Sequence, residues 1–188
     1  CSPETVEMLD MSEARTKIAA LHSGVRYGGS ERVTFSILEA LQDEYDVSLL
    51  TTSGPEGIDL ERLNAFCNTR VDPAKVRIEL RKLPGFIVNG PTMVRDALFA
   101  RFCRQREAGY DLIFHTYGTY STPLPCIQLI HDPCFNATLH RTLTCASGEE
   151  LPFRYRDTFL RRAYIGACRR LAGKRSARGP VLTTLVSS

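Results

Sequence analysis

Apolar positions along the chain follow two spacings that alternate from one segment to the next. Apolar or β-rich runs of strand length occupy residues 17–23, 46–52, 111–116, 126–132 and 180–188, and residues 76–83 alternate apolar and charged side chains as a half-exposed strand does. Amphipathic segments with helical spacing occupy residues 30–43, 58–66, 91–109 and 153–172. Strands that alternate with helices favour a parallel sheet that is covered on both faces. The pattern therefore predicts an α/β fold built on a Rossmann-like, doubly wound parallel sheet.

The length and composition of the chain predict a single domain. The chain has 188 residues, of which 43% are hydrophobic, and this is enough for a single core. We expect a polar tail at residues 1–16 and the domain at residues 17–188. In open parallel sheets, ligands bind at the carboxyl ends of the strands, near the point where the strand order reverses. The residues that directly follow the predicted strands are therefore the candidates for function.

The cysteines and the hydropathy of the chain indicate in which cellular compartment the protein works and whether it binds a metal ion. The seven cysteines are scattered and never spaced C-x-x-C, which favours free thiols in a reducing cytoplasm and predicts no metal site. No apolar run reaches the roughly 18 residues that a membrane span needs. Residues 1–16 also contain no apolar signal core. We therefore expect a cytoplasmic protein.

The stretch "VRYGGSERV" joins the first predicted strand to the first predicted helix. Gly28 and Gly29 lack a Cβ, so their backbone can adopt positive φ and lie against a ligand. The helix begins near Ser30, where its free amides and its dipole favour an anion. Glu31 suits the dipole but would repel a phosphate, unless Arg32 or a second domain supplies positive charge. The stretch matches neither G-x-G-x-x-G nor a Walker loop, and a tight turn with a serine cap would also explain it.

Two histidines stand at the ends of predicted strands. His131 ends "CIQLI" and precedes Asp132; the imidazole can accept a proton or hold a hydroxyl, and the carboxylate can raise the basicity of the imidazole or orient a second group. His115 ends "DLIF" and precedes a hydroxyl-rich loop that begins with Thr116 and Tyr117, which suits the binding of acceptor sugar hydroxyls. A structural histidine at a strand end and an ordinary polar loop are the alternatives at these two places.

A basic segment precedes the last predicted strand. Residues 151–178 hold nine bases and one acid, a local charge of +8 in a chain whose net charge is +3. Apolar residues separate the charges along residues 153–178. The segment is interpreted either as a solvated outer helix whose apolar face packs on the sheet, or as a surface for anionic lipid, or as a nucleic-acid patch.

Several of these stretches together resemble a known family. "KIAALHSGVRYGGSERVTFSILEAL" resembles the opening of family 4 glycosyltransferases of the GT-B fold, where a strand, a loop close to G-G-x-E-R and an amphipathic helix begin the N-terminal domain. "YDVSLLTT", "YDLIFHT", "IQLIHDP" and "VLTTLVSS" resemble later strands of that domain. The resemblance covers nearly all of residues 17–188.

The resemblance implies an enzyme of two Rossmann-like domains that transfers a sugar from a nucleotide-sugar donor to an acceptor hydroxyl. The N-terminal domain mainly holds the acceptor, and the C-terminal domain holds the nucleotide and carries the acids of an E-x7-E segment. By this likeness Gly28 and Gly29 approach the donor diphosphate, His131 lies near the reacting sugar, and Asp132 follows it as in many members. The acceptor is a polysaccharide or a lipid-linked glycan. The basic segment resembles surfaces that hold such enzymes at the inner face of a membrane, and no cofactor is implied.

The chain departs from the family because it stops at Ser188, where the second domain would begin. The resemblance thus implies the acceptor-side half, either as a fragment or as one subunit of a split enzyme. The absent half would supply an Arg/Lys pair that neutralises the leaving diphosphate, a charge that Arg32 cannot replace. We expect the chain alone to fold and to be nearly inactive.

Two other functions are compatible with the residues. A Rossmann-like sheet can hold a nucleotide or a partner without catalysis, and the glycine loop permits this as well. A basic nucleic-acid binder would show an affinity that falls steeply with salt. No nucleic-acid motif accompanies the basic segment, so we expect no nucleic-acid partner.

Overall fold

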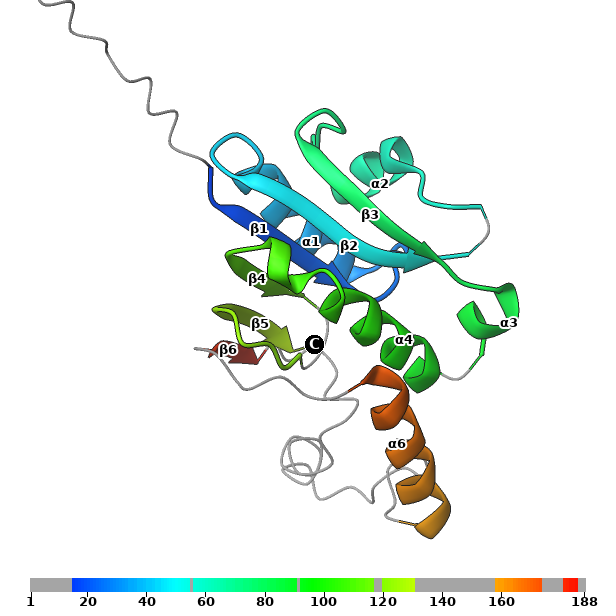
Figure 1. Cartoon of the computed structure of the whole chain (residues 1–188). Helices are drawn as coiled ribbons and strands as arrows, with labels where there is room; N and C mark the ends of the chain where they lie inside the picture. Colours follow the sequence, from blue (N-terminus) through cyan, green and yellow to red (C-terminus); the bar gives the residue numbers. More distant parts are fainter. Residues whose placement is uncertain are drawn as a thin grey trace, which may run out of the picture.

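A single sheet organises the part of the chain that the computed structural model describes, which is residues 15–54, 56–90, 92–116, 120–130, 158–173 and 181–185. Its six strands lie in the order β3-β2-β1-β4-β5-β6 (Figure 1). They are β1 (Lys17–His22), β2 (Asp46–Ser53), β3 (Val76–Lys82), β4 (Leu112–His115), β5 (Cys126–Ile130) and β6 (Val181–Leu185). Every neighbouring pair is parallel. The order reverses between β1 and β4, so the predicted Rossmann-like, doubly wound sheet is confirmed.

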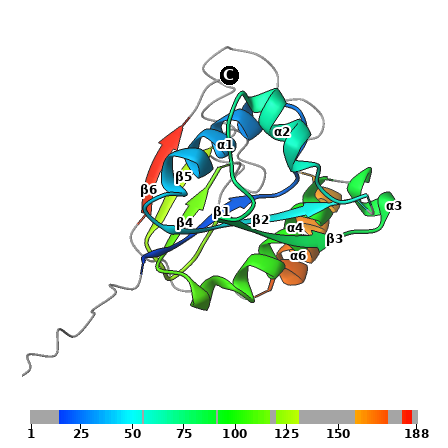
Figure 2. The ribbon, with the colours of Figure 1, turned by 90° about the horizontal axis from the view of Figure 1, so that it is seen from above.

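Helices cover both faces of the sheet, as Figure 2 shows. They are α1 (Gly29–Leu41), α2 (Leu60–Cys67), α3 (Gly85–Val88), α4 (Thr92–Arg104) and α6 (Phe159–Ala172), with a 3-10 turn at Glu107–Gly109. Helices α1 and α2 lie on one face, and α4 lies on the other with α6 packed against it. Within the described ranges, no helix is both long enough and apolar enough to cross a membrane.

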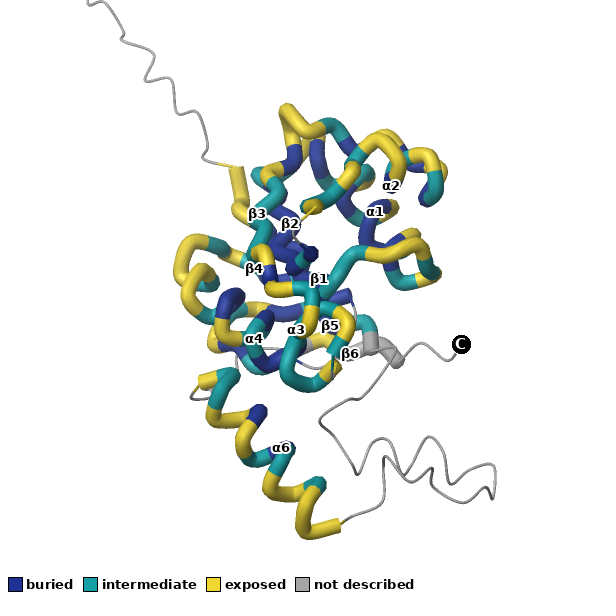
Figure 3. The backbone as a smooth tube through the Cα atoms, turned by 90° about the vertical axis from the view of Figure 1, so that its right-hand side faces the viewer, coloured by how far each residue is buried: buried dark blue, intermediate teal, exposed yellow. Residues whose placement is uncertain are grey.

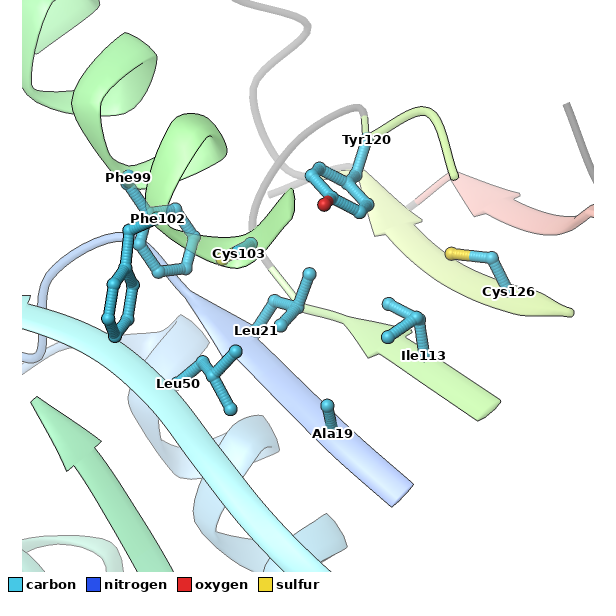
Figure 4. Close-up of a cluster of buried hydrophobic side chains, with 9 residues drawn as sticks. All are labelled: Ala19, Leu21, Leu50, Phe99, Phe102, Cys103, Ile113, Tyr120 and Cys126. Carbon is cyan, nitrogen blue, oxygen red and sulfur yellow. The ribbon is translucent and has the colours of Figure 1, made fainter. Parts of the chain in front are cut away.

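The core consists of two layers, one on each face of the sheet. Because neighbouring residues of a strand point to opposite faces, Ala19 and Leu21 of β1 pack beneath α4, whereas Ala20 packs beneath α1. Figure 4 shows the first layer, in which Phe99 and Phe102 of α4 meet these strand residues. The second layer consists of Ala20, Phe35, Leu38, Val47, Leu49, Leu63, Cys67, Val71 and Val76. The nearly continuous apolar run of β1 thus serves both layers.

The predicted helix 91–109 is shorter in the structure, where α4 ends at Arg104 and a 3-10 turn follows. Tertiary contacts hold the residues after α4. Nε of Arg106 lies 2.6 Å from Oε2 of Glu79 on β3, and its guanidinium covers the Phe102 ring at 4.1 Å from the centroid. Such tertiary contacts do not alter the spacing of apolar residues in the sequence. The predicted helix was therefore longer than α4 at its C-terminal end.

Short helix α3 was not predicted, because four residues are too few to show a periodicity. The other strands and helices agree with their predicted positions within a few residues at each end. The predicted parts 131–132 of the fifth strand and 153–157 of the last helix lie outside the described residues.

Four cysteines of the described chain are buried free thiols, as the sequence predicted: Cys67, Cys103, Cys126 and Cys168. Burial raises the pKa of each of these thiols. At Cys126 on β5 burial is the largest cause, and it raises the pKa from 9.0 to about 11. The protonated thiol is therefore favoured in the folded state.

This shift predicts a loss of stability at high pH. The contribution of Cys126 is complete below pH 9.0 and is lost as the pH rises to about 11, because only the unfolded chain ionises readily in that window. We expect the variant Cys126→Ala to lose less stability across this window, by on the order of 2 kcal/mol, in urea unfolding at each pH. Equal losses in the variant and the original chain would contradict the assignment.

Candidate functional site

A polar crevice opens at the carboxyl ends of β1 and β2, beside the end of α3 and the start of α4. Its larger lobe, of about 370 Å³, has hydroxyl, amide and charged groups in its lining, namely Ser23, Arg26, Glu31, Asn89, Thr92 and Arg95. A second lobe of about 260 Å³ lies over the end of β2, where Thr52, Ser53 and Glu56 line it. Arg26 and Arg95 line both lobes. Nowhere in the described ranges do three His, Cys, Asp or Glu side chains group as metal ligands.

Gly28, in the loop after β1, makes room for a neighbouring side chain. Gly28 has an extended backbone, with φ −148° and ψ −177°, and positive φ occurs among the described glycines at Gly57 and Gly173. Left-handed backbone is therefore not what these glycines provide, contrary to the reasoning from sequence. A Cβ at Gly28 would lie 2.9 Å from Oε2 of Glu31, whereas one at Gly29 would meet nothing within 4 Å. Gly28 thus leaves space for a carboxylate.

That carboxylate, of Glu31, lies at the positive end of α1. Its Oε1 accepts a 2.8 Å hydrogen bond from the backbone N–H of Arg26, and its Oε2 accepts a 2.9 Å bond from Oγ of Ser30. Nε2 of the buried His22 lies 4.0 Å from Oε1, and the Glu31 side chain is 6% exposed. An anion is favoured at a helix N-terminus. The protein therefore supplies its own anion where the sequence predicted an approaching phosphate, and a donor diphosphate beside this loop stays a prediction.

Arg32 contacts α2 and is not part of the crevice lining. Its guanidinium lies over the Phe66 ring, 5.0 Å from the centroid, and Arg62 lies over the Tyr27 ring at 4.8 Å. The Tyr27 and Phe66 rings meet edge to face with their centroids 5.3 Å apart. This stack fastens the glycine loop to α2. The sequence assigned the positive charge beside Glu31 to Arg32 or to a second domain, and the structure places the Arg32 guanidinium over Phe66.

Two other cations line the crevice, Arg26 and Arg95, and neither was predicted from the sequence. Nε of Arg95 lies 3.6 Å from Oδ1 of Asp96, and the Arg95 side chain is 12% exposed. Its guanidinium lies against Gly24, where a Cβ would be 3.7 Å away. Nη2 of Arg26 donates a 3.4 Å hydrogen bond to the carbonyl of Val88. The position of Arg26 in the glycine loop was a usable signal, but only the packing of α4 brings Arg95 to the crevice.

Two of the three predicted acceptor residues, His115 at the end of β4 and Thr116 after it, are buried. Thr116 is 0% exposed, and its hydroxyl donates to the carbonyl of Leu21 at 3.2 Å and accepts a 2.7 Å bond from Oγ1 of Thr34. His115 is 6% exposed. Direct acceptor binding by His115 and Thr116 does not fit this burial, because Thr116 instead joins β4 to β1 and α1. Tyr117 lies outside the described residues.

The predicted catalytic residues His131 and Asp132 also lie outside the described residues. Strand β5 ends at Ile130, the residue before His131. Because the strands are parallel, this end lies at the same edge of the sheet as the crevice. One strand, β4, separates β5 from β1, so the two strand axes are about 10 Å apart. The catalytic role stays a prediction.

The basic segment 153–178 is described over residues 158–173, where α6 lies mostly at the surface (Figure 3). Thr158 caps the helix by accepting a 3.2 Å hydrogen bond from the N–H of Arg161. Ile165 and Cys168 are buried. The exposed residues of α6 include Phe159, Leu160, Arg162, Arg169 and Arg170. Contact of this face with an anionic membrane surface stays a prediction.

Comparison with known proteins finds no matching family model and no match among the curated proteins. Among solved structures, HepE of Anabaena in complex with UDP and glucose is similar at 16% identity and a TM-score of 0.39, covering 92% of this chain. The chain spans 44% of the HepE chain. A universal stress protein in complex with cAMP is similar at 16% identity and a TM-score of 0.32, covering 92% of this chain and 98% of that protein. Both TM-scores are below 0.5, so we assign the fold from the strand order of the sheet and not from these similarities.

Proposed function

We propose that this chain is the acceptor-side domain of a glycosyltransferase, which transfers a sugar from a nucleotide-sugar to an acceptor hydroxyl. The observation that carries the proposal is the polar crevice between the glycine loop and the start of α4. It lies at the edge of the sheet where open parallel sheets bind ligands. The type of reaction is inferred from the resemblance of the sequence to family 4 glycosyltransferases.

The lining of the crevice suits a hydroxyl-rich ligand. Ser23 and Thr92 bring hydroxyl groups, Asn89 brings an amide, and Arg26 and Arg95 bring N–H donors. These groups can donate to and accept from sugar hydroxyls. A crevice of this volume lies near the lower end of the roughly 300–1,000 Å³ typical of ligand sites, which fits a small part of a larger acceptor.

The chemical step in this proposal falls to His131. Its imidazole would take the proton of the acceptor hydroxyl or hold that hydroxyl in place, and Asp132 would orient it. A second domain would bind the nucleotide and neutralise the charge that develops on the leaving diphosphate. The chain alone should therefore bind nucleotides weakly and transfer almost no sugar.

The alternative is a non-catalytic module that binds a nucleotide. Glu56 lines the lobe over the end of β2. In dinucleotide-binding Rossmann domains an acid at that place holds the ribose hydroxyls. This observation favours the alternative enough to require a direct test.

Calorimetric titration of the 188-residue chain with UDP-glucose, GDP-mannose and UDP separates the two functions. We expect dissociation constants weaker than about 1 mM for the acceptor-side domain, because most nucleotide contacts belong to the other domain. Binding tighter than about 10 µM by this chain alone would favour the nucleotide-binding module and contradict our proposal. The matched variant Glu56→Gln should weaken nucleotide binding only in that second case.

A further inference from the structure

Arg95 of α4 is a nearly buried cation that few protein groups satisfy. Within the described part of the chain its side chain pairs with Asp96 across 3.6 Å, and its Nε has no hydrogen-bond partner. That separation is too long for a good hydrogen bond. A guanidinium has five N–H donors, and burying it without partners is costly. Arg95 lines both lobes of the crevice.

Charge in the larger lobe is positive on balance. Among the lining residues, Arg26 and Arg95 stand against the carboxylate of Glu31, while Asp96, outside the lining, offsets part of the charge of Arg95. Helix α4 also begins there at Thr92 and has no acid in its first turn. The positive end of such a helix carries about half an elementary charge, which Asp96 in the second turn offsets only in part.

The amount of charge indicates which anion fits. A phosphate ester carries between one and about two negative charges at neutral pH, which the two arginines of the lining and the N-terminus of α4 attract. A nucleoside diphosphate carries more charge, and at the positive end of α1 it would meet Glu31. The lobe therefore suits a single phosphate better than a diphosphate.

We propose that the larger lobe binds a phosphate group on the acceptor, which makes the acceptor a phosphorylated sugar. The fork of Arg95 takes two phosphate oxygens, Arg26 closes over the phosphate from the exposed loop, and the sugar hydroxyls meet Ser23, Asn89 and Thr92. This inference rests on the proposed function and names its acceptor class. The second lobe, over the end of β2, leaves space for the group on the other side of the phosphate.

Calorimetric titration of the 188-residue chain at low salt tests the site, with glucose 1-phosphate as the probe. We expect glucose 1-phosphate to bind and glucose to bind at least about tenfold more weakly, because the phosphate carries the charge pairing. Arg95→Met should lower the affinity for glucose 1-phosphate by about tenfold or more, and Arg26→Met by several-fold. The control Arg101→Met, on the exposed face of the same helix, should leave the affinity unchanged.

Glu31→Gln should act in the opposite direction. It keeps an oxygen that accepts from Arg26 N–H but removes the one carboxylate of the larger lobe. We expect it to raise the affinity for glucose 1-phosphate about fivefold. A merely damaged fold would not bind more tightly, so this variant keeps the test decisive if Arg95→Met does not fold.

If glucose 1-phosphate binds, three outcomes would still overturn the inference. One is equal affinity for glucose 1-phosphate in the original chain, Arg95→Met and Arg26→Met. Another is UDP that displaces glucose 1-phosphate at a lower concentration than glucose 1-phosphate itself needs, which would make this a donor site. The last is binding to phosphatidylglycerol vesicles that depends on Arg95, which would make the occupant a lipid headgroup.

The inference and the proposed function can fail separately. Absent binding of glucose 1-phosphate, combined with sugar transfer to unphosphorylated acceptors by the two-domain enzyme, would end the inference and leave the function. The expected binding pattern without any sugar transfer by that enzyme would leave the phosphate site and end the proposed function.

Discussion

Replacing Phe35 with alanine should lower the free energy of unfolding by about 3–5 kcal/mol, a large part of the roughly 5–15 kcal/mol of a typical domain. Phe35 of α1 is 0% exposed and packs with Ala20, Leu38 and Leu49 between the helix and the sheet. Its removal would leave a cavity that the surrounding strands cannot close. Urea unfolding followed by circular dichroism measures the loss.

Phe86 provides the matched control, because the same substitution there removes a ring that is 79% exposed. We expect Phe86→Ala to change the free energy of unfolding by no more than about 0.5 kcal/mol. Comparable losses in the two variants would mean that α1 does not pack on the sheet as described.

Replacing His131 with alanine should slow sugar transfer by about a hundredfold or more, the usual contribution of a side chain that moves a proton in the transition state. The measurement is the release of nucleoside diphosphate from a nucleotide-sugar, in the presence of acceptor, by this chain joined to a donor-binding domain. A pH profile of the rate adds a second readout, because the variant should lose an inflection that belongs to an imidazole.

His140 is the control for this prediction, since nothing in the sequence or the site assigns it a function. We expect His140→Ala to transfer sugar at the original rate. Full turnover by the His131→Ala enzyme would remove the role proposed for His131 and with it the link between the end of β5 and the chemistry.

The glycine loop illustrates how far the candidate site could be predicted. The residue types and the position between strand and helix pointed to this loop, and its residues Arg26 and Glu31 line the crevice, whereas its approach to a donor diphosphate stays a prediction. The sequence could not show that the carboxylate of Glu31 turns back to the N–H of Arg26, or that Arg32 stacks on Phe66. The side chains of Glu31 and Arg32 are long enough to point into the crevice or away from it. Which of the two they do depends on the neighbours that α2 and the loop provide.

The residues at the end of β4 also show that burial cannot be predicted from residue types alone. A histidine followed by hydroxyl residues fits a binding loop and a buried hydrogen-bond network equally well. Thr116 belongs to the second kind, because Leu21 and Thr34 offer partners to its hydroxyl inside the protein. Burial of this kind depends on which strand is the neighbour, and that neighbour is 95 residues away in the chain.

Periodicity in the chain was sufficient for the sheet, its parallel strands and most of the helices, because the side-chain repeat of each element is a local property that apolar residues record directly. The crevice depended on tertiary structure. Arg95 reaches it only because α4 packs across the ends of β1 and β2, and its charge matters there because burial removes the water that would otherwise screen it. The distance of Arg95 from the crevice and its loss of hydration depend on how separate elements pack together. The spacing of residues within one helix or strand does not determine either of them.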